Sequence, residues 1–252
     1  MLKTRVIPSL LLQDGGFVKT IKFSKPSYLG DPRNIIRIFN EKEVDEIVIL
    51  DIDATKEKRR PYFDLLKDIV SEAFMPIAYG GGIKTIEDIK NLYKIGIEKV
   101  VINSHAVNEP LFIKEASDKF GSQSIVISID VKKNLFSNYK VLIESCRKKT
   151  NYSPVELALM MEEYGAGEII LNSIDRDGTM EGYDLELIKS VASSVSIPVI
   201  ALGGAGKMED LRDAINVGAS AVSAGSIFVY QGIHKAVLIN YPSQEELEEY
   251  LI

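Results

Sequence analysis

Two aspartates lie at or just beyond the ends of apolar runs, which is where the active sites of α/β proteins are found. Asp130 ends the run 125–130, and Asp177 lies in a charged, glycine-bearing loop after the run 169–174. Ligands bind at the carboxyl edge of parallel strands, and a carboxylate there can act as a general acid or base. Each aspartate could instead cap a helix or hold a loop. Three further strand-end aspartates fit that structural role better, because such side chains often bond to nearby backbone: Asp51, Asp53 and Asp175.

Glycine pairs follow two other apolar runs, and small polar residues follow the next run along the chain in each case. Glycine at a strand end lets backbone N–H groups approach an anion closely. In barrels the loops after strands seven and eight commonly form a phosphate site. Two such sets suit a substrate with an anionic group at each end, although tight turns alone would also explain the glycines. The sets are Gly81, Gly82, Asn103 and Ser104, and Gly203, Gly204, Gly225 and Ser226.

Charged residues begin four of the runs: Arg5, Glu46, Lys99 and Glu168. Side chains that point inward there would form a ring of two acids and two bases at the amino-terminal face. Buried charges are costly unless they are paired, so mutual ion pairs are expected. The ring would be either a salt-bridged plug in the barrel floor or a polar gate for a small polar molecule.

The elements that position these residues alternate between apolar strands and amphipathic helices. Eight such units predict one domain over residues 1–252, a closed (β/α)8 barrel with a parallel sheet. An open doubly wound sheet is the alternative, and residues 13–30 and 131–151 are expected to be long loops. The predicted strands are residues 6–11, 47–52, 76–79, 100–103, 125–130, 169–174, 198–202 and 221–224.

The two halves of the chain repeat. Residues 46–53 resemble 168–175, and residues 76–82 resemble 198–204, both at an offset of 122 positions. One offset over such a span indicates a duplicated half-barrel. When strand one is aligned on strand five, Ser9 falls on Ser128, and the counterpart of Asp130 is Leu11.

Composition excludes several other classes of protein. The chain has 252 residues, 46% of them hydrophobic, which is enough for a large core. One cysteine and two histidines exclude an intrachain disulfide framework and argue against a zinc site, so no metal or cofactor is expected. A net charge of −6 without a basic stripe argues against nucleic-acid binding. No apolar run is long enough for a membrane span, and a cytoplasmic location is the default expectation.

Several motifs resemble one known family. The chain is similar over nearly its whole length to the cyclase subunit of imidazole glycerol phosphate synthase, a (β/α)8 barrel of histidine biosynthesis. That family is the ammonia-using half of a glutamine amidotransferase. The motifs are SIDRDGT at 173–179, GYD at 182–184, YGGGI at 79–83, FGSQ at 120–123, SID at 128–130 and GGAGKM at 203–208.

The resemblance implies a partner and a reaction. A glutaminase subunit would dock on the amino-terminal face, and ammonia would pass through the charged ring and the barrel core. At the mouth it would attack a substrate with two phosphates, followed by lyase and cyclisation steps. The resemblance assigns Asp130 as catalytic acid/base, Asp177 as an assisting residue and the ring as the gate. Substrate binding falls to the two glycine sets, with Gly178 and with Lys19 on a mobile loop.

The chain departs from this family at one catalytic position, because the family's aspartate at the end of strand one is Leu11 here. Asp14, three residues further on, is a conceivable substitute. The motif around Leu11 instead resembles a divergent branch linked to bacterial surface-polysaccharide or flagellin sugars. Two functions follow: a cyclase-type enzyme, or an ammonia-channelling partner subunit for sugar amidination. The related isomerase of the preceding step also uses paired aspartates and fits less well.

Overall fold

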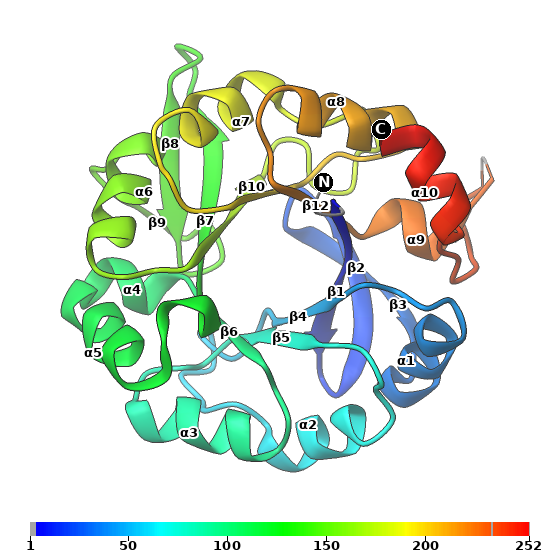
Figure 1. Ribbon diagram of the computed structural model, residues 1–252, viewed down its shortest axis with the longest axis horizontal. Helices are drawn as coiled ribbons and strands as arrows, with labels where there is room; N and C mark the ends of the chain where they lie inside the picture. The colour runs from blue at the N-terminus through cyan, green and yellow to red at the C-terminus, as the bar shows by residue number, and fades with distance from the viewer. Residues whose placement is uncertain (1–3, 233, 252) are drawn as a thin grey trace.

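Eight parallel strands close into a barrel, as predicted. The computed structural model describes residues 4–232 and 234–251, and Figure 1 looks down the barrel axis. The ring of strands closes where the fifth barrel strand pairs with the sixth, so the open doubly wound alternative is wrong. The barrel strands are β1 (Arg5–Gln13), β4 (Ile47–Asp51), β5 (Ile77–Gly80), β6 (Lys99–Ile102), β7 (Ile125–Lys133), β10 (Glu168–Ser173), β11 (Val199–Leu202) and β12 (Ala221–Ala224).

Helices surround the strands on the outside (Figure 1). Sequence-encoded caps set several of their starts, since a cap satisfies backbone N–H groups that lack a partner within the helix. Thr85 and Asp88 form the expected capping box, and Ser243 with Glu246 makes the same exchange before the last helix. The helices are α1 (Pro32–Glu41), α2 (Phe63–Val70), α3 (Ile86–Lys94), α4 (Ser104–Asn108), α5 (Pro110–Phe120), α6 (Pro154–Glu163), α7 (Leu185–Ala192), α8 (Met208–Asn216), α9 (Ser226–Val229) and α10 (Gln244–Leu251).

The two segments expected to be long loops are β-hairpins instead. Strands β2 (Gly16–Ile21) and β3 (Ser24–Gly30) extend β1, and β8 (Tyr139–Ile143) and β9 (Lys148–Lys149) extend β7. The sequence lacks an Asn-Gly or Asp-Gly marker at the tip of the first hairpin. Lys22 and Phe23 take the left-handed conformation there at φ 52° and 60°. The turn between β1 and β2 does carry this marker, because Asp14-Gly15 joins the two strands with both residues at positive φ, 47° and 78°.

The strand register matches the repeat in the sequence. Ser9 pairs with Val48 between β1 and β4, and Ser128 pairs with Ile170 between β7 and β10. These two pairs occupy corresponding places under the offsets found in the sequence. Each of the two hairpins also follows the first strand of its half. The tertiary structure thus carries the same two-fold organisation as the chain.

The barrel interior is layered because strand side chains alternate between the two faces of a sheet. Charged residues line the floor, and apolar side chains fill the middle. Polar residues then line the mouth, where the strands end. The middle layer contains Ile7, Val48, Ala78, Val101, Val126, Ile170, Ile200 and Ala221.

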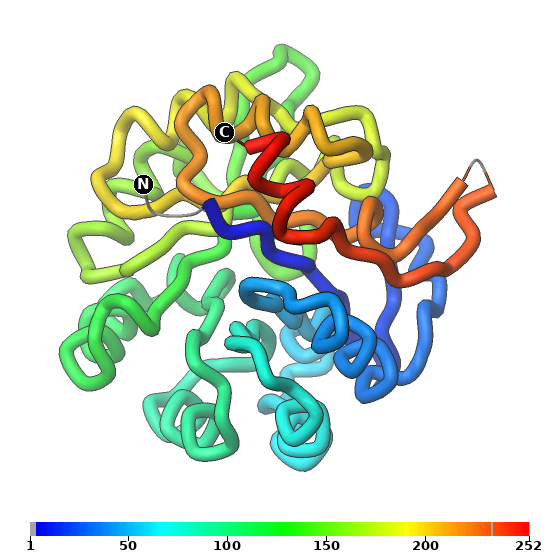
Figure 2. The backbone as a smooth tube through the Cα atoms, turned by 45° about the vertical axis from the view of Figure 1, so that its right-hand side comes forward, coloured from blue at the N-terminus to red at the C-terminus, as the bar shows by residue number. Residues whose placement is uncertain are grey.

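The segment that precedes the last helix, α10, lies against the first strand of the barrel, β1 (Figure 2). The Tyr241 hydroxyl of this segment donates a 2.8 Å hydrogen bond to the Val6 carbonyl. Helix α10 packs on α8. Within residues 4–232 and 234–251, no helix is both long and apolar enough to span a membrane.

Candidate active site at the barrel mouth

The carboxyl ends of the strands surround a cavity of about 720 Å³. A cavity of that size suits a small-molecule ligand. It gathers every residue that the sequence predicted for catalysis or substrate binding. These are Lys19, Gly81, Gly82, Asn103, Ser104, Asp130, Asp177, Gly178, Gly203, Gly204, Gly225 and Ser226.

Asp130 lies between two amides at the end of β7. Asn103 Nδ2 donates to one carboxylate oxygen at 3.1 Å, and Asn172 Nδ2 donates to the other at 3.0 Å. Burial raises the pKa of Asp130 to about 7, with the nearby Asp177 charge adding to the shift, while the two amides lower it. A carboxyl group with a pKa near neutrality can both accept and donate a proton. The Asp130 carboxyl group can therefore exchange a proton near neutral pH with a ligand in the cavity.

The Asp177 carboxylate accepts hydrogen bonds from three residues of the β2–β3 hairpin. Its Oδ1 accepts from Lys19 Nζ at 2.7 Å, and its Oδ2 accepts from the Thr20 hydroxyl at 3.0 Å. The backbone N–H of Phe23 also donates to Oδ2, at 3.3 Å. Gly178 allows this approach, because a Cβ there would lie 2.3 Å from the Thr20 carbonyl oxygen. Asp177 thus anchors the β2–β3 hairpin at the rim of the mouth.

The barrel position opposite Asp130 carries no acid, although Asp51 and Asp53 line the cavity from the end of the neighbouring strand β4. Leu11 lines the cavity and pairs in register with Leu50, as Asp130 pairs with Asn172. Asp14 does not replace the missing acid, because it lies exposed in the β1–β2 turn and is not among the residues that line the cavity.

The glycine sets have a structural explanation as well as a functional one. A Cβ at Gly81 would lie 2.6 Å from the Asp51 carbonyl oxygen, and one at Gly204 would lie 2.2 Å from that of Gly182. Both glycines also have positive φ. Packing alone therefore requires glycine at these turns. The stronger sign of a ligand is Ser226, whose buried hydroxyl has no hydrogen-bond partner.

Two of the other three strand-end aspartates, Asp51 and Asp175, hold backbone as predicted, whereas the Asp53 carboxylate bonds to the Gln13 side chain. Asp51 accepts from the N–H groups of Asp53 and Ala54 and forms a two-pronged ion pair with Arg59. Asp175 accepts from the backbone N–H of Lys133 at 2.8 Å. These contacts fix the loops around the mouth.

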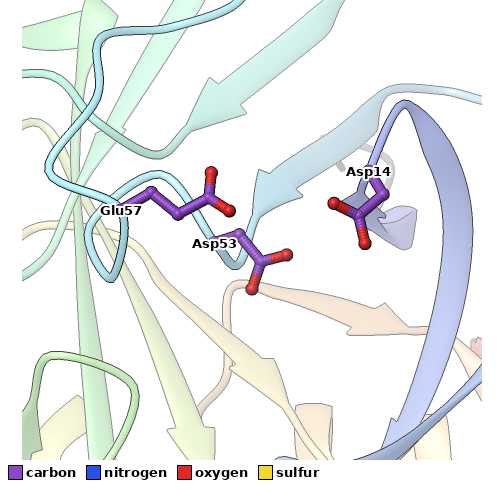
Figure 3. A group of neighbouring side chains, drawn as sticks. All are labelled: Asp14, Asp53 and Glu57. Carbon is purple, nitrogen blue, oxygen red and sulfur yellow. The ribbon is translucent and has the colours of Figure 1, made fainter.

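A group of acids lies near the cavity. Figure 3 shows Asp14 on the β1–β2 turn facing the loop that carries Asp53 and Glu57. Their carboxylate oxygens lie within 4.8 Å of one another. Asp53 accepts from Gln13 Nε2 at 2.9 Å and lies 3.9 Å from Lys56 Nζ. The Asp53 carboxylate thus already interacts with the side chains of Gln13 and Lys56.

The charged ring forms at the opposite end of the barrel. Arg5 donates to Glu46 at 2.7 Å and to Glu168 at 2.8 Å. Lys99 Nζ lies 3.0 Å from Glu46 and 3.1 Å from Glu168, so acids and bases alternate. Burial opposes the charge on Arg5, but the attraction of Glu168 and Glu46 outweighs it and raises the pKa of Arg5. The predicted mutual pairing is confirmed.

Sequence analysis missed two residues at the mouth. Asn172 holds Asp130, and it lies on the same inward face as Glu168, four residues earlier on β10. That alternation could have singled it out as an inward polar residue. Glu144 lines the cavity from the β8–β9 turn, and its N–H donates to Ser104 Oγ at 2.9 Å. No local pattern indicated that contact, because the two residues are 40 positions apart.

Several known proteins that are similar to this chain carry the name of the same enzyme subunit. A protein of *Leptospira interrogans*, provisionally named imidazole glycerol phosphate synthase subunit HisF, is 52% identical over 98% of each chain. A *Pseudomonas aeruginosa* protein with the provisional name subunit hisF2 is 51% identical over 98% of this chain and 99% of its own. The HisF subunit of *Alkaliphilus metalliredigens* is 43% identical over 92% of this chain and 93% of its own.

The match also holds at the level of the family. Residues 5–235 match the family described as Histidine biosynthesis protein. That span includes the charged ring, Asp130, Asp177 and both glycine sets. The chain therefore belongs to the Histidine biosynthesis protein family, as a divergent HisF-like member.

Proposed function

We propose that this chain is the ammonia-using, cyclase-type subunit of a glutamine amidotransferase, with a glutaminase subunit docked on its amino-terminal face. One observation carries the proposal: a closed ring of four alternating charges stands at the end of the barrel opposite the mouth. The names of the relatives support it, because they describe one subunit of a synthase. Such a subunit needs a source of ammonia.

The layered interior supports passage of a neutral molecule. Above the ring, ammonia meets the apolar middle layer, which includes the small side chains Ala78 and Ala221. Transfer of an ion into such surroundings is far more costly than transfer of a neutral polar molecule. The core would therefore favour ammonia over ammonium. Lys99, which is bound to both acids of the ring, is the side chain whose displacement would open the gate.

At the mouth, Asp130 would serve as the acid/base. In the enzyme that this chain resembles, ammonia and a bisphosphorylated aminoimidazole precursor give imidazole glycerol phosphate, an aminoimidazole carboxamide ribotide and water. Proton transfers in such lyase and cyclisation steps need a group that titrates near neutral pH, which the pKa of Asp130 near 7 provides. Asp177 would assist the reaction indirectly, by holding the β2–β3 hairpin at the rim of the mouth.

A second candidate function is favoured by Leu11. Loss of one general acid or base typically costs about 10²–10⁴-fold in rate. The ring keeps all four of its charges, whereas the position opposite Asp130 at the mouth is occupied by Leu11. That combination suits a subunit that conducts ammonia for amidination of a bacterial surface-polysaccharide or flagellin sugar, with little cyclase activity.

Co-expression with the glutaminase gene of the same organism tests the proposal. We expect the two chains to co-purify and the complex to use glutamine as its nitrogen source. Lys99→Ala should lower glutamine-dependent product formation and leave the reaction with ammonium salts unchanged. If no glutaminase binds and Lys99→Ala leaves glutamine coupling intact, the proposal is wrong. Near-normal cyclase turnover with ammonium salts would eliminate the second candidate.

A further inference from the structure

The second hairpin, residues 131–149, projects beyond the ring of helices and has an apolar tip between β7 and β8 (Figure 1). Leu135 is fully exposed at this tip, and the adjacent Phe136 is 84% exposed. Water disfavours exposed apolar surface in proportion to its area. Two neighbouring large apolar side chains on a projecting turn therefore mark a candidate interaction surface.

Hydrogen bonds within the tip hold it as a closed turn. Asn134 Oδ1 accepts from the N–H of Phe136 at 2.8 Å and from the N–H of Asn138 at 3.0 Å. The Asn134 N–H donates to the Asn138 carbonyl, and the Ser137 N–H donates to the Asn134 carbonyl. The backbone N–H groups of residues 134, 136, 137 and 138 thus all have partners inside the turn. Internal pairing of this kind is what a segment needs if it enters a lipid layer, because hydrocarbon offers no hydrogen bonds.

The strands of the second hairpin are strongly basic. Residues 131–149 contain six bases and one acid, although the whole chain has a net charge of −6. Among the described residues, Lys133 is the only one of the six in an ion pair, with Asp184 and Glu186. Lys132 and Lys140 lie directly opposite each other on paired strands, where like charges repel. An anionic surface would relieve that repulsion. The six bases are Lys132, Lys133, Lys140, Arg147, Lys148 and Lys149.

The size and shape of the tip favour a lipid surface over a protein partner. A stable protein–protein interface buries at least about 1,000 Å² between complementary surfaces, whereas this tip offers two apolar side chains on a protruding turn. An anionic bilayer needs no complementary pocket. Apolar side chains enter the boundary between headgroups and acyl chains, and nearby bases contact the lipid phosphates. A hairpin that is apolar at its tip and basic along its strands matches that division.

We infer that the second hairpin attaches the protein peripherally to an anionic membrane surface. Leu135 and Phe136 enter the headgroup layer, and the bases along the strands bind the lipid phosphates. The hairpin extends β7 beyond Asp130, so the attachment lies at the mouth end of the barrel and leaves the charged ring at the opposite end free. The inference goes beyond the proposed function, because neither Asp130 nor the ring takes part in lipid binding.

Sedimentation of the full chain with vesicles tests the role of charge. Phosphatidylcholine vesicles with about 30% phosphatidylglycerol should bind the protein at least about tenfold more tightly than pure phosphatidylcholine, and added salt should weaken the binding. Lys148→Glu with Lys149→Glu should weaken it by at least about 25-fold, since each base near an anionic surface contributes about fivefold. Lys67→Glu with Lys94→Glu is the matched control, because it changes the net charge equally at exposed positions of α2 and α3 and should leave binding unchanged.

Insertion of the tip has a readout of its own, because the chain contains no tryptophan. Phe136→Trp introduces a single fluorophore, whose emission should shift to shorter wavelength with anionic vesicles and be quenched by brominated lipid. Leu135→Ser with Phe136→Ser should weaken binding by at least about tenfold, since both side chains leave water on insertion. Phe74→Ser is the control, because Phe74 is 93% exposed and lies on the loop before β5, away from the hairpin, so its loss should have no effect.

Three results would overturn the inference. They are failure of the full chain to sediment with anionic vesicles, an unshifted Phe136→Trp emission in the sedimented protein, and equal losses for Phe74→Ser and the double serine variant. If vesicles do not bind and Leu135 and Phe136 instead hold a protein, the tip is a protein-docking site and the inference is wrong. No measurement here requires a glutaminase or ammonia, so failure of the proposed function is a separate result.

Discussion

Leu11 and Asp130 occupy equivalent positions on opposite walls of the barrel mouth. Leu11 lies beside Leu50 on the neighbouring strand, and Asp130 lies beside Asn172. Of these two pairs, only Asp130 and Asn172 combine a carboxyl group that can bind a proton with a hydrogen bond that orients it. The two halves of the mouth therefore differ at this position in their capacity for proton transfer.

Replacing Leu11 by aspartate should restore cyclase activity. We expect the unmodified protein to convert the bisphosphorylated aminoimidazole precursor very slowly with ammonium salts. Leu11→Asp should accelerate the reaction by roughly 10²-fold, since one general acid or base contributes about 10²–10⁴-fold. Product formation followed by chromatography measures the change.

The matched control for that experiment is Leu11→Asn, which has nearly the same shape as Leu11→Asp but cannot exchange a proton at neutral pH. It should remain as slow as the unmodified protein. Equal rates for the two variants would show that polarity rather than proton transfer limits the reaction.

The ionisation of Asp130 should make stability depend on pH. Its pKa in the folded protein is about 7, raised by burial from the ordinary value of 3.8. Between these values the folded state binds more protons than the unfolded state, so the free energy of unfolding falls as pH rises from about 4 to 7. At pH 8 the ionised group costs the folded state at most about 4 kcal/mol.

Asp130→Asn should remove this dependence. Chemical denaturation at pH 5 and pH 8 should show the variant gaining stability relative to the unmodified protein only at the higher pH. The exposed Asp118 provides the control, because Asp118→Asn should change both values equally. An identical pH profile for Asp130→Asn and the unmodified protein would contradict the raised pKa.

Breaking the floor ring should destabilise the protein. Lys99→Met leaves Glu46 and Glu168 with only Arg5 as a partner, although Glu46 is only 4% exposed. Removing one member of a buried ion pair costs about 3–5 kcal/mol, and the partial exposure of Lys99 reduces this to roughly 2–3 kcal/mol. Denaturant unfolding at neutral pH measures the loss.

A surface ion pair supplies the comparison for the ring. Lys119 and Glu115 form an exposed pair one helical turn apart, at 2.7 Å. Lys119→Met should cost no more than about 0.5 kcal/mol. Similar losses for the two lysine variants would mean that the ring contributes no more than a surface contact.

Removing Asp177 should release the first hairpin from the mouth. Asp177→Ala leaves the buried Lys19 ammonium without its carboxylate and removes the bond to Thr20. Hydrogen exchange across residues 16–30 should become about 10–100-fold faster, because the segment opens at lower free energy. Trypsin should also cut more readily at the Lys22–Lys25 turn.

Asp175→Ala is the matched control, because Asp175 bonds to Lys133 of the second hairpin. It should loosen residues 131–149 and leave residues 16–30 protected. Faster exchange in the first hairpin of both variants would indicate a general loss of stability instead.

Local patterning in the sequence predicted much of the fold and the site. Apolar runs of strand length, helix caps such as Thr85–Asp88 and the repeat at one offset specify a barrel made of two similar halves. They also place Asp130 and Asp177 at one end and Arg5 and Glu168 at the other, because all strands of a parallel barrel point the same way. The identity of Leu11 as the counterpart of Asp130 follows from the same repeat.

Only the tertiary structure decided how the two halves differ. The hairpins 16–30 and 139–149 form through pairing with strands. The Asp14-Gly15 turn signals the first of these pairings locally, whereas the hairpin tips at Lys22–Phe23 and Glu144–Arg147 carry no such signal. Their contacts are long-range: Lys19 meets Asp177, and Glu144 meets Ser104. A repeat in the sequence makes two anion sites look equal, but hydrogen bonding is a property of neighbours in space. Ser104 Oγ finds hydrogen-bond partners in the fold, and Ser226 Oγ does not.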